Sequence, residues 1–136
     1  MPTWGLPHIA FSPRGHDAHV GTTVLIVDDH AGFRASARRL LQAEGFEVVG
    51  EAGDASGGVA EARRLRPEMV LLDVGLPDRD GFAVARELAA GSEPPKVVLV
   101  TGRDYEEMEP LIAQSPARGL VPKDRLSGEA LEALLL

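Results

Sequence analysis

The sequence predicts an α/β protein in which a doubly wound, five-stranded parallel sheet is covered by helices on both faces, a (βα)5 arrangement. Two observations lead to this class. Short apolar runs rich in Val, Leu and Ile alternate with segments of helical periodicity, and the connections between them are short. Aromatic residues make up only 4% of the 136 residues, so aliphatic side chains must fill a layered core.

In the first half of the chain, strands are expected at 24–27 and 46–50, and helices at 31–44 and 56–65. The run at 24–27 has no polar interruption, as expected for a strand buried on both faces. Apolar residues of the first helix share one face, and Gly45 ends it as a C′ glycine. The start of the second helix looks weak because it contains Gly57 and Gly58.

In the second half, an apolar strand begins at Met69 and ends at Asp73, and further strands are expected at 96–100 and 119–121. Helical periodicity marks 82–88, 104–114 and 126–136. The helix at 104–114 has a thin apolar face and contains Pro110, which would bend or restart it. Ser127 is a candidate N-cap of the last helix.

Residues 1–21 are expected to form a flexible N-terminal tail, and residues 22–136 the folded domain. The tail has no strand or helix period, and its His16 and His19 are expected to be solvated rather than to bind a metal. The chain has no cysteine, so disulfides and thiolate metal sites are excluded. Its formal net charge of −7 disfavours direct binding of nucleic acid. No apolar run is long enough to span a bilayer, and the N-terminus lacks the basic region and the cleavage site of a signal peptide. A cytoplasmic location is therefore expected.

Polar side chains follow four of the five predicted strands: Asp28 and Asp29, then Asp73, Thr101 and Lys123. The carboxyl ends of parallel strands meet at one edge of a sheet, where ligands bind in doubly wound folds. Each residue alone has a plainer interpretation, because Asp29 or Thr101 could cap a helix and Lys123 could be solvated. Three crowded carboxylates, however, would repel one another unless a cation such as Mg²⁺ neutralised them.

This set of residues suits phosphoryl transfer to a carboxylate. A carboxylate can attack a phosphoryl group to give an acyl phosphate, and the reaction then needs positioning and neutralisation of charge. Mg²⁺ held by Asp28 and Asp29, the ammonium of Lys123 and the hydroxyl of Thr101 would each stabilise phosphoryl oxygens around Asp73.

Five short motifs resemble the receiver domain of two-component response regulators over about residues 22–136. They are Val27-Asp28-Asp29-His30, Leu71-Leu72-Asp73-Val74, Leu76-Pro77 with Asp80-Gly81, Val100-Thr101 and Pro122-Lys123. The start of the first helix and the segment 119–123 look most like the subfamily with helix-turn-helix output domains, and hence like transcription regulators.

The resemblance implies a flavodoxin-like strand order of 2-1-3-4-5 and a role for each site residue. Asp73 would be the phosphoacceptor. Asp28, Asp29, Asp73 and the carbonyl of Gly75 would bind Mg²⁺, while Thr101 and Lys123 would contact the phosphoryl group. The Pro122 peptide bond is expected to be cis, as is typical at this place in the family.

The resemblance also implies a sensor histidine kinase as the partner that supplies the phosphoryl group. The chain would be a signalling switch rather than an enzyme, catalysing only its own phosphorylation and dephosphorylation. The switched surface would comprise residues 104–114, 119–121 and 126–136, acting through homodimerisation or docking of another domain. This domain would bind neither nucleic acid nor a membrane directly.

Three departures from the family pattern motivate an alternative, a phosphate-independent interaction module, although the complete set of site residues speaks against it. Leu120 stands where an aromatic switch residue is common, and Tyr105 lies elsewhere in the chain. Gly102 replaces a common alanine. No output-domain sequence follows Leu136, which leaves a single-domain regulator and a piece of a longer protein both open.

Two other classes fit the sequence poorly. A hydrolase of the haloacid dehalogenase type needs an acid/base Asp two residues after its nucleophile, where this chain has Gly75. A nucleotide-binding domain would need a Gly-rich phosphate loop after the first strand, where this chain has Asp-Asp-His.

Overall fold

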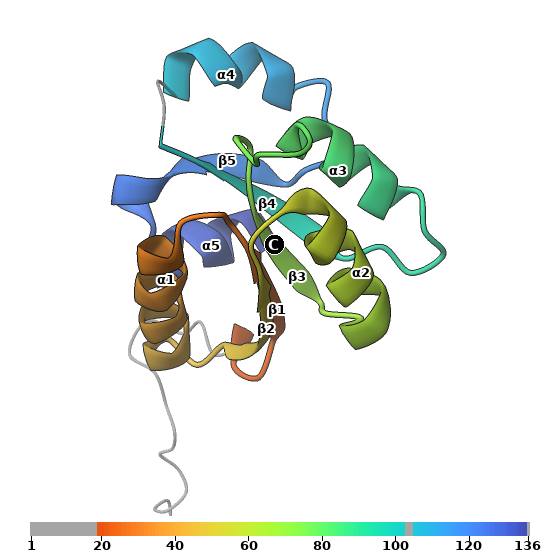
Figure 1. Cartoon of the computed structure of the whole chain (residues 1–136). Helices are drawn as coiled ribbons and strands as arrows, with labels where there is room; N and C mark the ends of the chain where they lie inside the picture. Colours follow the sequence, from red (N-terminus) through yellow and green to blue (C-terminus); the bar gives the residue numbers. More distant parts are fainter. Residues whose placement is uncertain (1–18, 103–104, 136) are drawn as a thin grey trace, which may run out of the picture.

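The computed structural model describes residues 19–102 and 105–135, and Figure 1 shows their arrangement. Five parallel strands form one sheet in the order β2-β1-β3-β4-β5, which confirms the predicted fold class and strand order. The strands are β1 Thr23–Val27, β2 Glu47–Ala52, β3 Met69–Asp73, β4 Lys96–Thr101 and β5 Gly119–Pro122. The helices are α1 Ala31–Ala43, α2 Ala55–Leu65, α3 Gly81–Ala89, α4 Tyr105–Ile112, the short 3-10 helix η2 Lys123–Arg125 and α5 Gly128–Leu135.

Alternating side chains of the central strands fill two apolar layers, one on each face of the sheet. In β3, Val70 and Leu72 face the layer formed with α2 and α3, whereas Met69 and Leu71 face the layer formed with α1 and α5. All four side chains have no exposed surface. Burial on both faces is the reason that these strands are continuously apolar in sequence.

Local signals set several helix ends at or within two residues of the predicted positions. Gly45, at φ +98°, follows α1 and provides the left-handed backbone expected of a C′ glycine. The hydroxyl of Ser127 accepts a hydrogen bond from the backbone N–H of Ala130 at 3.0 Å, as predicted for an N-cap. The last helix therefore begins at Gly128, two residues later than the apolar pattern suggested, and η2 occupies part of the preceding connection.

One of the two glycines that weakened the predicted start of α2 is required by close packing. A Cβ atom on Gly58 would lie 2.8 Å from a methyl carbon of Val27 on β1, closer than side chains approach. The helix start gains its stability elsewhere, because the Asp54 carboxylate accepts a hydrogen bond from the N–H of Gly57 at 2.7 Å. Small residues here let α2 lie directly on the sheet.

The structure overturns the expected cis bond at Pro122, because the described residues contain no cis peptide bond. Pro122 has extended backbone angles of φ −61° and ψ 138°, and it pairs with Thr101 at the end of β5. A trans bond continues the strand in register with β4, whereas a cis bond would redirect the chain there.

The expectation that His19 is solvated is wrong. Its side chain is buried and stacks on the ring of Phe46 at a centroid distance of 4.6 Å. Its Nδ1 lies 3.2 Å from a carboxylate oxygen of Glu132 on α5. Residues 1–18 of the predicted tail, including His16, lie outside the described residues, so the flexible tail and the domain boundary stay predictions. Within the described part of the chain, no helix has the length and apolarity that a bilayer span requires.

Candidate functional site

The carboxyl-terminal edge of the sheet brings the predicted site residues together. Asp28 follows β1 and is fully buried, and Asp73 ends β3 with 4% of its surface exposed. Lys123 begins η2 directly after β5, and its Nζ lies 2.7 Å from Asp28 Oδ2 and 3.4 Å from Asp73 Oδ2. One ammonium group thus bridges two buried carboxylates from neighbouring strands.

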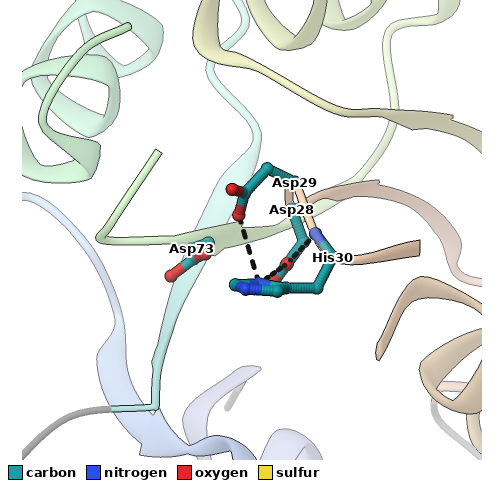
Figure 2. Close-up of side chains that lie close together, drawn as sticks. All are labelled: Asp28, Asp29, His30 and Asp73. Carbon is teal, nitrogen blue, oxygen red and sulfur yellow. Dashed lines mark hydrogen bonds and ion pairs between the residues drawn. The ribbon is translucent and has the colours of Figure 1, made fainter. Parts of the chain in front are cut away.

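Asp29 and His30 complete a compact group of potential metal ligands with Asp28 and Asp73. One oxygen or nitrogen atom from each of the four side chains lies within 4.8 Å of the others. Figure 2 shows Asp29 and His30 reaching over Asp28, with Asp73 nearby. Asp29 and the imidazole of His30 are exposed to solvent, so the group has an open side through which an ion can enter.

The donor set fits a divalent cation. Carboxylate oxygens are the ligands that Mg²⁺ prefers, and it usually keeps several waters beside them. Asp28 Oδ2 is buried, and the Lys123 ammonium at 2.7 Å is its only partner among the described residues. A second cation near this oxygen would relieve the repulsion that remains among the carboxylates.

The carboxyl of Asp73 has an unusual environment for an acidic side chain. Burial raises its pKa, and the nearby Asp28 carboxylate raises it further. The N–H of Gly75, which donates to Asp73 Oδ1 at 3.0 Å, and the Lys123 ammonium act in the opposite direction. The Gly75 hydrogen bond and the Lys123 ion pair hold the Asp73 carboxyl in one orientation, and they offset only part of the effect that burial has on its pKa.

The loop after β3 depends on Gly81 at the start of α3. A Cβ atom there would lie 2.5 Å from the backbone oxygen of Asp73 and 2.6 Å from Val74 Cα. The Asp80 carboxylate accepts a hydrogen bond from the N–H of Phe82 at 2.8 Å and caps this helix. Asp80-Gly81 was singled out in the sequence, and the structure gives the pair a structural role, holding α3 against the end of β3.

A cavity of about 770 Å³ opens beside Asp73 between the loops that follow β3 and β4. Thr101, buried at the end of β4, lines it together with Lys123, Gly75 and Gly102. Its other wall is apolar and includes Phe82, Met108 and Leu111. The space is large enough for a phosphoryl group beside Asp73, with the predicted hydroxyl and ammonium groups on its wall.

Sequence reasoning placed Phe33 on the apolar face of the first helix and His30 in a motif, but it gave neither side chain a contact in the site. The Lys123 ammonium lies 4.7 Å from the centre of the Phe33 ring, which holds the ammonium from the side of α1. The imidazole of His30 contacts both neighbouring aspartates. The only signal for His30 was its position after the acidic pair, and nothing in the sequence indicated a contact between residues 33 and 123.

Comparisons with known proteins agree with this geometry. The model of the family described as response regulator receiver domain matches residues 24–135. The transcription regulator BvgA of Bordetella pertussis is 36% identical over 110 residues, which cover 81% of this chain and 53% of BvgA. The chain thus spans about half the length of that relative.

Two solved structures extend the likeness to the fold. The signal receiver domain of the response regulator NarL from Mycobacterium tuberculosis is 30% identical, with a TM-score of 0.75 over 85% of this chain and 94% of that one. A LuxR-family two-component response regulator from Aurantimonas sp. SI85-9A1 is 26% identical, with a TM-score of 0.75 over 85% of this chain and 83% of that one. These relatives agree with the predicted subfamily of transcription regulators.

Proposed function

The chain belongs to the family of response regulator receiver domains, and from this premise we propose that it is a Mg²⁺-dependent phosphoacceptor whose Asp73 takes a phosphoryl group from a sensor histidine kinase. The observation that carries the proposal is the meeting of Asp73, the buried Asp28 and the Lys123 ammonium at one edge of the sheet. The proposal depends on these side chains lying close together, because the same residues spread over the surface could not act on one phosphoryl group.

In the proposed reaction, an oxygen of Asp73 attacks the phosphorus of a phosphohistidine. The new O–P bond forms as the N–P bond breaks, and the imidazole leaves with the bonding electron pair. The Gly75 N–H orients the attacking carboxylate. Lys123 would neutralise part of the phosphoryl charge, and Thr101 would donate a hydrogen bond to another phosphoryl oxygen.

Mg²⁺, when bound by Asp28, Asp29, Asp73 and the Gly75 carbonyl, would neutralise further negative charge on the phosphoryl oxygens. Lys123 would then move from Asp28 Oδ2, its nearest carboxylate oxygen in this structure at 2.7 Å, toward the phosphoryl group. This movement is the proposed link between the chemistry and the surface formed by α4, β5 and α5. The proposed outcome is homodimerisation or docking of another domain.

One of the three departures behind the alternative, a phosphate-independent interaction module, can be followed in the structure. Leu120 is an aliphatic residue of β5, and its side chain packs in the apolar core instead of providing an aromatic switch. The intact set of site residues favours the phosphoacceptor.

The experiment is phosphorylation by acetyl phosphate or phosphoramidate, read by intact mass with and without Mg²⁺. We expect the wild type to gain one phosphoryl group, about 80 Da, only with Mg²⁺. Asp73→Asn should gain none, whereas the matched control Asp124→Asn, at an exposed position outside the site, should behave as the wild type. A folded wild type that binds Mg²⁺ without forming the adduct would overturn the phosphoacceptor proposal and favour the alternative.

A further inference from the structure

We propose that the His30 imidazole is a nitrogen ligand of the acidic site, so that the site binds a divalent transition-metal cation, represented by Zn²⁺, more tightly than Mg²⁺. The inference deepens the proposed function, because it rests on the same carboxylates binding a cation. It adds a ligand to the site and a competing class of cation.

The position of the ring carries the proposal. His30 Nδ1 lies 3.2 Å from Asp28 Oδ1 and 3.2 Å from Asp29 Oδ1 (Figure 2). Two ligands that share one ion at metal–ligand distances of about 2.1 Å stand about 3.0 Å apart in octahedral and about 3.4 Å apart in tetrahedral geometry. The nitrogen is thus already spaced from both oxygens as a shared ion requires.

The chemistry of the donors predicts the selectivity. Mg²⁺ prefers oxygen ligands and retained waters, so an imidazole nitrogen adds little to its binding. Imidazole is a common ligand of Zn²⁺, whereas sites of carboxylate and water oxygens suit Mg²⁺. His30 therefore strengthens Zn²⁺ binding selectively, while Asp28 and Asp73 serve both cations.

The Lys123 ammonium is the internal competitor for this place. It lies 2.7 Å from Asp28 Oδ2 and 3.5 Å from His30 Nδ1, so it occupies one side of the same group of donors. A cation bound at Asp28 and His30 would repel the ammonium toward Asp73 and the cavity. Since both cations would bind Asp28 and Asp73, Zn²⁺ and Mg²⁺ would compete with each other, and each would compete with the Lys123 ammonium, for the same carboxylates.

The fold does not depend on the imidazole. The His30 side chain is 69% exposed, and at the N-cap of α1 it makes no capping hydrogen bond. Its backbone carbonyl accepts the N–H of Arg34 at 3.1 Å, which a substitution would leave in place. Replacing the side chain thus tests its role as a ligand without removing a core contact.

The test is calorimetric titration of the full chain with Zn²⁺ and, separately, with Mg²⁺. Every protein in these titrations carries His8→Ala and His16→Ala, which remove two other candidate nitrogen ligands in the N-terminal segment. The chain with these two substitutions alone is the parent. We expect His30→Ala to weaken Zn²⁺ binding by about 10- to 100-fold and Mg²⁺ binding by less than about 3-fold. His30→Asn, which offers an oxygen instead of the nitrogen, should behave like His30→Ala toward Zn²⁺. In the parent, the ¹⁵N resonance of His30 Nδ1 should shift on addition of Zn²⁺ but not of Mg²⁺.

Asp28→Asn separates the inference from the proposed function. Loss of both cations in Asp28→Asn, with Zn²⁺ affinity unchanged in His30→Ala, would overturn the role of His30 and leave the phosphoacceptor proposal standing. Equal losses of Zn²⁺ and Mg²⁺ in His30→Ala would likewise overturn the selectivity and make His30 a partner of the carboxylates only. Failure of the parent to bind either cation would remove both proposals.

Discussion

Helices α1 and α4 both cover the sheet next to the acidic site, yet they are held in very different ways. α1 buries Ala37 and Leu41, and its arginines pair with Glu51 on β2. α4 contains no buried residue, and Leu111 on it is 47% exposed. Elements with few buried apolar contacts open at low free-energy cost. The cavity beside Asp73 thus has one wall on a helix with buried core residues and the other on a helix without a fully buried residue.

The difference matters for the proposed switch. Phe33 and His30, which contact Lys123 and the acidic pair, belong to the first turn and the N-cap of α1. Met108 and Leu111 of α4 line the opposite, apolar wall of the cavity. Because α1 has buried core residues and α4 has none, we expect a response to a change in charge at Asp73 to occur in α4 rather than in α1.

The largest effect should come from removing a core contact of α1. Leu41 has no exposed surface, so Leu41→Ala should lower the free energy of unfolding by about 2–5 kcal/mol. Leu111→Ala, the matched substitution on α4, should change it by less than about 0.5 kcal/mol. Urea unfolding at one pH measures both. Equal losses in the two variants would show that α4 is packed as firmly as α1.

A smaller effect is expected from the ion pairs that tie α1 to β2. Hydrogen bonds from Arg38 and Arg34 to Glu51, at 2.6 and 3.0 Å, lower the pKa of the Glu51 carboxyl. Because the pKa is lower in the folded state, this contribution is complete above the pKa of the unfolded chain and is lost as the pH falls through the folded value. Glu51→Gln should cost about 1 kcal/mol at pH 7.

The pH dependence provides the check on this second prediction. The difference in unfolding free energy between wild type and Glu51→Gln should shrink between about pH 5 and pH 3. A difference that stays constant over this range would mean that packing of the side chain, rather than its charge, holds α1 to β2.

The smallest effect should come from the segment between β4 and α4. A Cβ atom on Gly102 would meet Lys123 Cδ at 3.9 Å, an ordinary contact, and its backbone does not need a glycine conformation. Gly102→Ala should therefore raise stability by about 0.5 kcal/mol, mainly by restricting the unfolded chain. Amide exchange should slow in α4 relative to α1. A loss of stability would show that the connection needs the freedom of glycine.

The sequence by itself determined the order of the elements and the residue types at the strand ends. Periods of 2 and 3.6 residues and local signals such as Gly45 and Ser127 act over a few residues, so they can be recognised without knowing the fold. Parallel connectivity then places Asp28, Asp73, Thr101 and Lys123 at one edge, because the carboxyl ends of parallel strands coincide there.

Only the tertiary structure decided which side chains meet across long separations in the chain. The contact of Phe33 with Lys123 and the burial of His19 against Phe46 depend on how helices and strands pack. The peptide bond at Pro122 is trans, the usual form of X–Pro bonds, although the resemblance to the family implied a cis bond. Such contacts leave no periodic trace in the sequence, because they join single residues whose approach is set by the packing of whole elements.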